Sequence, residues 1–502
     1  MIEPVYEKIN FNLKEETIKE QIKAEAKTEV LSENVQSILA VSPFVTVSVN
    51  EITDGKIVYG GKVIFYISYV DTDGALKKCE CGNEFVGEIK NPLVKKGCRE
   101  YITAEAEKVE ADISGLKLSA GAYINVCLNL TDCAEINALK NGENLVVEEK
   151  DLTKIKSLGV RRGVYPIEEE FEIGYAVEEV LFHRADAVIT ATQCGVGVII
   201  VDGEVLLSAI MLQKGDKKDI IKETKTLPFR MEIECEEAMP NMYSSARVKE
   251  RSFKTDVQVD AENSKSVVLV SVSLGFEGEA FALTDARVAS DAFSTENEIE
   301  LIKEEYPFYK TCEIRSFTGV IGGRAAVSEL PVGAIIMAVG GEKATVLSES
   351  CSDGTFVVTG TLGATAFVRD GDGRVFTRKL EIPFEKSFDA GFNCLMQTAT
   401  VVKVARATAK IVSLTEMDVE ADLRFTVYPQ EKCAVSVVKD VKFLGEKKKN
   451  DAAISIYIPT EGEELWSLSK RLNVCPETLI ETNKELQFPL TGKERIVVYR
   501  RK

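Results

Sequence analysis

The sequence is short of the residues on which most catalytic sites depend. Its 502 residues include one histidine, His183, and one tryptophan, Trp466. Ser-His-Asp and Cys-His mechanisms need a histidine base beside a nucleophile, and no motif around Ser208 or Cys194 suggests such a pairing. No GxxxxGK[ST] phosphate loop occurs either. The sequence therefore predicts a protein that is not an enzyme and that needs no cofactor, with His183 in a structural or surface position.

Long apolar runs are also missing. Nowhere do about 18 uninterrupted apolar residues occur, which predicts no membrane span. The N-terminus lacks an apolar core flanked by basic residues, which predicts no Sec-type export. The 12 cysteines are scattered through a long chain, a distribution typical of reduced thiols in a cytosol. Cys79 and Cys81 form the only close pair, and without CxxC knuckles they predict no metal site.

Charge and length narrow the class of protein further. The net charge of −18 argues against binding to nucleic acid, which needs concentrated lysine and arginine. The basic clusters at 447–449 and 500–502 are interpreted as a solvated linker and tail. A chain of this length with 45% hydrophobic residues is expected to fold into about three or four domains.

The body of the chain repeats itself at a period of about 150 residues, which predicts three homologous domains. The segments Gly61 to Phe85 and Gly360 to Phe384 align without a gap, and each has a period-two apolar face. Their DTDG and DGDG turns predict hairpin tips rather than calcium loops. A middle copy, Glu204 to Ile233, has a shorter turn and the same Pro-Phe ending.

Short strands at close spacing, with little helical periodicity, predict a mainly β protein of three repeated sandwich or barrel-like domains. The segment Asn12 to Asn34 is the exception. Its Glu and Lys content favours a helix, and Ile18, Ile22 and Ala26 give it a thin apolar stripe. We expect an N-terminal arm here that orders against a partner.

The last fifty residues differ from the rest and predict a small strand-helix-helix-strand module. Ile454 to Ile458 alternate as a strand, and Ile496 to Tyr499 return as another. Between them, Glu463 to Leu472 and Pro476 to Asn483 repeat at helical spacing. Trp466 falls at helical spacing with apolar leucines, which predicts that its ring belongs to the core of the module.

This tail resembles a LysM domain, and the whole chain resembles repeated SPOCS domains followed by such a domain, the layout of SipL-like spore coat morphogenetic proteins. The three strand-turn-strand units that close on a phenylalanine carry the SPOCS resemblance. The tail positions that match are Tyr457, Gly462, Leu465-Trp466-Ser467, Val474, Asn483 and Gly492. The predicted divisions are an arm at 1–25, SPOCS-like domains at 26–150, 159–300 and 310–443, a basic linker at 444–451 and a LysM domain at 452–502.

The resemblance implies a noncatalytic protein of the mother-cell cytoplasm that is recruited to the forespore surface. There it is expected to scaffold spore coat assembly and encasement through a coat morphogenetic ATPase and other coat proteins. A LysM groove lies between the turn into the first helix and the loop after the second. The predicted groove residues are Thr460, Glu461, Gly462, Glu463, Glu464, Glu485, Leu486, Gln487, Phe488 and Pro489.

Two occupants of this groove stay open, a protein partner and the N-acetylglucosamine chains of peptidoglycan. Glu461-Gly462-Glu463 replaces the usual Pro-Gly-Asp approach to the first helix, and Cys475 stands where Ser or Thr would normally cap the second. These departures favour protein docking over glycan binding. The alternative is a peptidoglycan-binding anchor of the spore envelope or cell wall.

Overall fold

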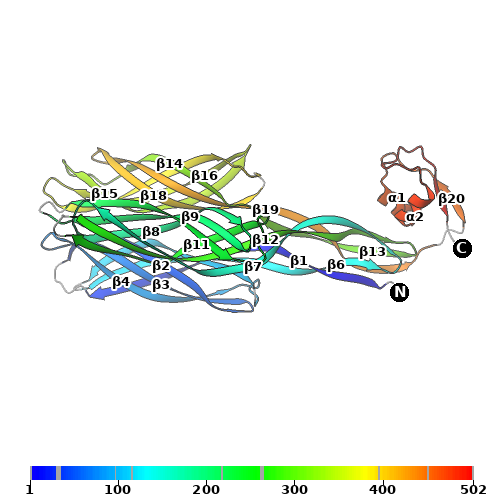
Figure 1. Ribbon diagram of the computed structural model, residues 1–502, viewed down its shortest axis with the longest axis horizontal. Helices are drawn as coiled ribbons and strands as arrows, with labels where there is room; N and C mark the ends of the chain where they lie inside the picture. The colour runs from blue at the N-terminus through cyan, green and yellow to red at the C-terminus, as the bar shows by residue number, and fades with distance from the viewer. Residues whose placement is uncertain are drawn as a thin grey trace.

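The computed structural model confirms a mainly β protein of three repeated sandwich units, followed by a small module that holds the two helices of the described chain (Figure 1). Among the described residues, no helix is long and apolar enough to cross a membrane. The structure describes residues 3–29, 35–96, 98–114, 117–215, 219–260, 265–393, 396–448 and 452–499.

The first unit is a sandwich of two three-stranded antiparallel sheets, ordered β1-β6-β5 and β2-β3-β4. The first strand of the unit pairs with the last, and the middle three strands form a meander. The strands are β1 (Pro4–Glu29), β2 (Val35–Thr53), β3 (Lys56–Asp71), β4 (Leu76–Lys90), β5 (Arg99–Ser114) and β6 (Lys117–Gly142).

The same topology recurs twice. The second unit has sheets β11-β12-β7 and β10-β9-β8, and the third has β15-β16-β17 opposite a sheet in which β13, β14 and β18 all pair with β19. In the third unit the first strand is therefore interrupted. The second-unit strands are β7 (Leu145–Ile173), β8 (Val177–Cys194), β9 (Val198–Gln213), β10 (Ile220–Glu234), β11 (Tyr243–Asp260) and β12 (Lys265–Ser294). The third-unit strands are β13 (Asn297–Thr311), β14 (Arg315–Ala326), β15 (Ile335–Ser352), β16 (Thr355–Arg369), β17 (Val375–Asp389), β18 (Gln397–Ser413) and β19 (Glu416–Glu446).

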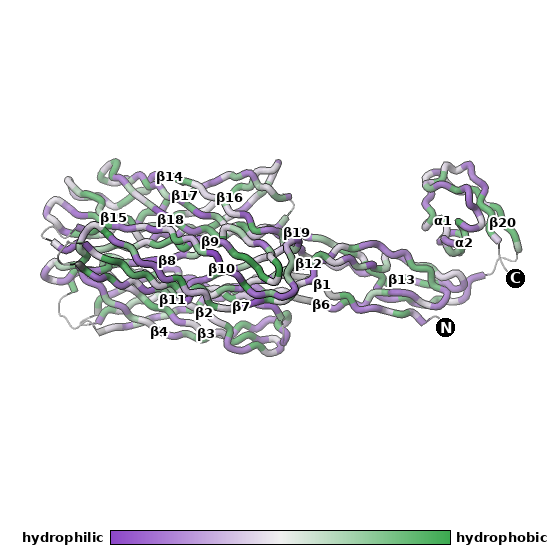
Figure 2. Tube along the Cα trace, in the orientation of Figure 1, coloured by the Kyte–Doolittle hydropathy of each residue, from purple (hydrophilic) through white to green (hydrophobic). Residues whose placement is uncertain are grey.

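Alternating hydropathy is what turns these segments into half-buried strands, and the alternation is visible along the chain in Figure 2. The period-two face predicted for the first and third copies is confirmed. All eight of its side chains are buried between the two sheets of their unit. They are Val63, Phe65, Ile67 and Tyr69 in β3, and Leu362, Ala364, Ala366 and Val368 in β16.

A glycine opposite a phenylalanine marks each of the three units. Gly61 pairs with Phe85, Gly203 with Phe229 and Gly360 with Phe384. At Gly203 an added Cβ would lie 2.3 Å from the Phe229 ring and 2.5 Å from a backbone carbonyl, so the ring covers the glycine. Glycine allows this close approach because it has no side chain. The middle copy was predicted to begin at Glu204, one residue after Gly203, and so left out the glycine that pairs with phenylalanine in every unit.

The two predicted hairpin turns are confirmed, with one hydrogen-bond pattern. The Asp71 carboxylate accepts the amides of Asp73 and Ala75, at 3.0 and 2.8 Å. The Asp370 carboxylate accepts those of Asp372 and Arg374 at the same two distances. Each leading aspartate therefore organises its own turn, as expected of Asp in this position.

The helix predicted within 12–34 is wrong for the part that the structure describes, because residues 4–29 form strand β1. A spacing of four is a multiple of two, so Ile18, Ile22 and Ala26 also share one face of a strand. Ala24 lies on the same face and is buried. Glu20 is on it too, where its carboxylate accepts the Tyr59 hydroxyl at 2.7 Å. From residue 4 onward, the predicted arm is an integral strand of the first unit.

The longest strands continue beyond the sandwiches and form a stalk, which consists of residues 4–14 with 132–142, 145–157 with 281–294, and 297–311 with 430–446 (Figure 1). Each of these three ribbons contributes side chains to a shared core. Ile9, Val288 and Phe308 are all buried in it. One ribbon alone could not bury an apolar face, so the stalk depends on all three units.

A second shared core joins the units within the body. Leu39 from the first unit, Phe182 and Ile210 from the second, and Phe367 from the third are buried in one cluster. Each unit therefore packs against both others, and the body is one assembly rather than a string of separate domains.

Candidate functional site

The C-terminal module folds around its own leucine core. It consists of β20 (Ile454–Tyr457), α1 (Leu465–Leu472), α2 (Pro476–Thr482) and β21 (Ile496–Tyr499). The helices bury Leu468, Leu472 and Leu479 against Ile496 and Val498 of β21. The strand-helix-helix-strand order matches the expectation from the sequence.

The structure brings the two predicted groove segments together. The Gly462 amide donates to the Leu490 carbonyl at 2.7 Å, and the Leu490 amide donates to the Glu463 carbonyl at 3.0 Å. Gly462 has a φ of +81°, a left-handed conformation that favours glycine. The loop before α1 and the loop after α2 therefore form one continuous surface.

Three of the predicted groove residues serve the fold of the module. The Glu463 carboxylate accepts the Thr460 amide at 3.0 Å and pairs with Arg471 at 2.8 Å, and its side chain is only 7% exposed. The Arg471 guanidinium, helped by the Thr460 amide and against some burial, lowers the pKa of Glu463. Leu486 and Phe488 pack on the leucine core.

The other predicted groove residues are exposed and therefore available to a ligand. They bring three carboxylates, from Glu461, Glu464 and Glu485, to the surface of the two loops. Such a surface accepts hydrogen bonds from lysine and arginine. The exposed groove residues are Thr460, Glu461, Gly462, Glu464, Glu485, Gln487 and Pro489.

Trp466 does not lie in the core of the module, so that prediction is wrong. Its indole N–H donates to the Asp291 carboxylate of β12 at 2.9 Å, and its ring meets Phe293 edge-on at 5.3 Å between centroids. Leu465 and Leu468, its neighbours on α1, do contact the core. Helical spacing with leucines could not reveal that this side chain points toward the stalk.

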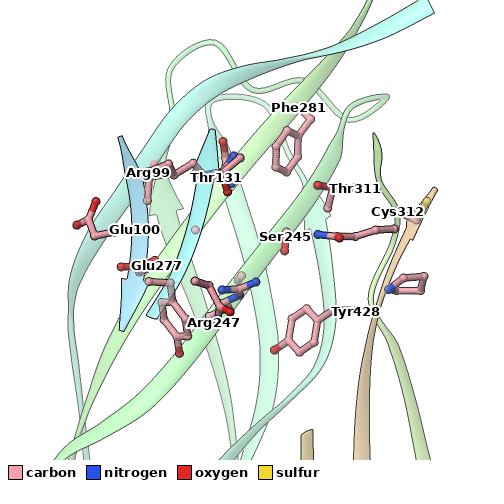
Figure 3. A pocket seen from close by; sticks show the side chains of 18 residues that line it. Arg99, Glu100, Thr131, Ser245, Arg247, Glu277, Phe281, Thr311, Cys312 and Tyr428 are labelled. Atoms are coloured by element: carbon pink, nitrogen blue, oxygen red, sulfur yellow. The ribbon is translucent and has the colours of Figure 1, made fainter. Parts of the chain in front are cut away.

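A polar pocket lies where the three units meet, with a cavity of about 70 Å³ (Figure 3). Its charged side chains have partners of opposite charge: Arg99 pairs with Glu279, and Glu100 pairs at 2.8 Å with Arg162, which lies outside the lining. Figure 3 shows Arg247 beside Glu277 and Tyr428. The Arg247 guanidinium stacks over the ring of Tyr101 from the first unit at 4.6 Å and faces Tyr428 from the third at 5.9 Å. These contacts indicate that the pocket belongs to the interface that holds the three units together.

His183 lies between two aromatic rings, with its centroid 4.8 Å from that of Tyr66 and 4.7 Å from that of Phe253. Burial, together with the charge of Lys78, lowers the pKa of His183 to about 4. Neither ring nitrogen has a hydrogen-bond partner within the described part of the chain. The imidazole is therefore a neutral packing group at pH 7.

The cysteines form no recognisable metal centre in the residues that the structure describes, where no group of three or more His, Cys, Asp or Glu could hold an ion. Burial, with Cys81 close by, raises the pKa of Cys79 to about 11, which disfavours the thiolate that a metal needs. Of the cysteines that the structure describes, nine are free thiols. Cys351 is disulfide-bonded and departs from the expectation of reduced thiols throughout.

Fold and site together define a β-sandwich protein of three units whose stalk carries a small βααβ module with an acidic two-loop surface. Comparisons with protein-family models, with curated proteins and with solved structures found no match for this chain.

Proposed function

We propose that this chain is a noncatalytic scaffold of spore coat assembly, and that the two-loop surface of its C-terminal module docks on a coat morphogenetic ATPase. The observation that carries the proposal is that Gly462 and Glu463 bond to Leu490, directly after 485–489, in a module at the far end of the stalk (Figure 1). These bonds hold the exposed side chains of 460–464 and 485–489 close to one another. The resemblance to SPOCS and LysM proteins supplies the partner and the setting.

The charge of the surface favours a protein over a glycan. Glu461, Glu464 and Glu485 would face a neutral sugar chain without ion-pair partners, whereas lysine and arginine side chains of a protein would complement them. The rest of the molecule supports a scaffold, because its three units and its stalk share cores that fix their arrangement. A rigid body of this kind holds the end of the stalk, where the module docks, at a fixed distance from the units.

The test compares charge-reversed full-length proteins in binding to the purified ATPase. We expect the combined change Glu461→Lys, Glu464→Lys and Glu485→Lys to weaken binding by about tenfold or more, because each carboxylate becomes a like charge toward a basic partner. The matched control reverses three exposed glutamates of the second unit, Glu168, Glu170 and Glu232, and should bind as the unaltered chain does.

The proposal is wrong if the groove variant binds the ATPase as tightly as the unaltered protein. It is equally wrong if the control loses as much affinity, since net charge would then account for the effect. Sedimentation of the unaltered chain with purified peptidoglycan, without ATPase binding, would support the alternative anchor function instead.

A further inference from the structure

One carboxylate of the stalk accepts hydrogen bonds both from the stalk itself and from the C-terminal module. Asp291 accepts the Trp466 indole N–H at 2.9 Å and the Lys470 ammonium at 2.7 Å, both from α1. Lys303, from β13 of the stalk, reaches the same carboxylate at 3.0 Å. The Asp291 side chain is 16% exposed, so these three donors replace most of its water.

An irregularity in β12 coincides with the placement of this carboxylate. The register between β12 and β7 shifts between Ala289 and Asp291, which leaves Ser290 as the extra residue of a bulge. Ala289 and Ala292 remain in the stalk core, while Asp291 and Phe293 contact the module. Bulges characteristically redirect side chains in this way. The tip of the stalk therefore presents the Asp291 carboxylate next to the Phe293 ring.

The module meets this tip with a single face of α1. Trp466 and Lys470 are four residues apart and so lie on one side of α1, and Asn473 follows as the C-terminal cap of the helix. Lys447 adds two hydrogen bonds next to this contact. Its ammonium donates to the Ser294 carbonyl of the stalk at 2.7 Å and to the Asn473 side chain of the module. Among the described residues, the hydrogen bonds and ring contacts of the predicted groove stay within the module, so docking of α1 leaves the groove uncovered.

We propose that this contact is a latch, in which the α1 face of the module is a docking surface for the stalk tip and Asp291 is the group that holds it closed. Closed, the latch fixes the direction in which the two-loop surface faces. Open, it leaves the module folded, because among the described residues the leucine core of the module includes none from the stalk. The contact is confined to a few side chains, so it can open without unfolding either part.

The latch does not rest on the proposed partner, and the protein carries its own probe. Trp466 is the only tryptophan in the chain, so fluorescence excited at the indole band reports on this contact alone. In the full-length protein, Asp291→Asn should shift the emission maximum to the red and raise the acrylamide quenching constant, because the indole loses a charged acceptor and gains water. Hydrogen exchange should rise in α1 of the same variant.

Two further variants make the test decisive. Lys470→Met removes a donor from the exposed module side, where it cannot disturb the stalk, and should give a shift in the same direction. Asp285→Asn is the matched control, since Asp285 lies on β12 and bonds Thr153 away from the module. Emission and quenching unchanged in both Asp291→Asn and Lys470→Met would overturn the latch, as would an equal shift in the Asp285→Asn control.

Discussion

Lys403 of the third unit donates to the Asp186 carboxylate of the second unit at 3.0 Å, across a boundary that no single unit could form. Arg184 approaches the same carboxylate at 3.1 Å. Burial alone would raise the pKa of Asp186, but the charges of Lys403 and Arg184 hold it below its usual value. The charge of Asp186 in turn keeps Lys403 protonated by raising its pKa despite burial. The units are therefore joined by ionised side chains as well as by apolar contacts.

Replacing Lys403 with methionine should destabilise the body by about 3–5 kcal/mol, because Asp186 then keeps only Arg184 of its two cationic partners and the buried charges no longer balance. Urea unfolding followed by circular dichroism would show the change as a lower midpoint. Lys439→Met is the control, since Lys439 pairs with Glu304 on the exposed surface of the stalk. A midpoint for Lys403→Met that equals the control would contradict this account of the boundary.

Gly203→Ala should lower stability by about 1–3 kcal/mol, because the new Cβ would need space already filled by Phe229 and a backbone carbonyl. Gly322→Ala offers a matched control in β14, where the nearest heavy atom to an added Cβ lies 3.6 Å away. Thermal unfolding of the two variants compares them directly. If both lose the same stability, the glycine opposite phenylalanine has no special packing role.

The corrected position of Trp466 predicts different effects for two neighbouring residues of α1. Leu468 is fully buried in the module, so Leu468→Ala should cost about 2–5 kcal/mol and unfold it. Trp466→Ala should leave the module folded and only detach it. Hydrogen exchange measured by mass spectrometry on peptides of 476–482 distinguishes the outcomes, because α2 loses protection only if the module unfolds. Loss of protection in Trp466→Ala would restore the core assignment.

The latch should weaken in acid. Burial would raise the pKa of Asp291, but hydrogen bonds from Lys470, Trp466 and Lys303 outweigh it and lower the pKa to about 2. Folding with the latch closed therefore favours the ionised form. The stabilisation of the closed latch by ionised Asp291 is complete above the unfolded-state pKa of about 3.9. It is lost as the pH falls through the folded-state pKa.

Fluorescence titration of the full-length protein checks this dependence. Trp466 emission should be constant from neutral pH down to about 4 and should then shift to the red. The Asp291→Asn variant supplies the baseline because it cannot titrate at this position. A curve for the unaltered protein that follows the variant at every pH would contradict the assignment.

Strands and hairpins could be predicted because local patterns specify them, and the threefold repeat could be predicted because those patterns recur along the chain. Alternation in β3 and β16 places every second side chain on one face, and the turns at Asp71 and Asp370 close on their own amides. The pairing of two distant loop segments into the groove was expected from the resemblance, and the structure joins them through Gly462 and Leu490. The binding role of that groove remains a prediction.

The helix expected near the N-terminus and the core position expected for Trp466 failed for one reason. Ile18 and Ile22 fit a helix and a strand equally well, and only β6 decides between them by offering a partner edge. Trp466 fits any apolar site at helical spacing, and only the carboxylate of Asp291 shows where it lies. In both cases the deciding group is more than 90 residues away along the chain.

The sequence alone determined that this protein is built from β-strands in three similar units with a small terminal module, because side-chain periodicity and turn chemistry act between near neighbours. Tertiary structure alone decided how the three units share a stalk and an inner core, and which face of α1 meets Asp291. Those arrangements depend on burial and charge pairing between residues that lie far apart along the chain.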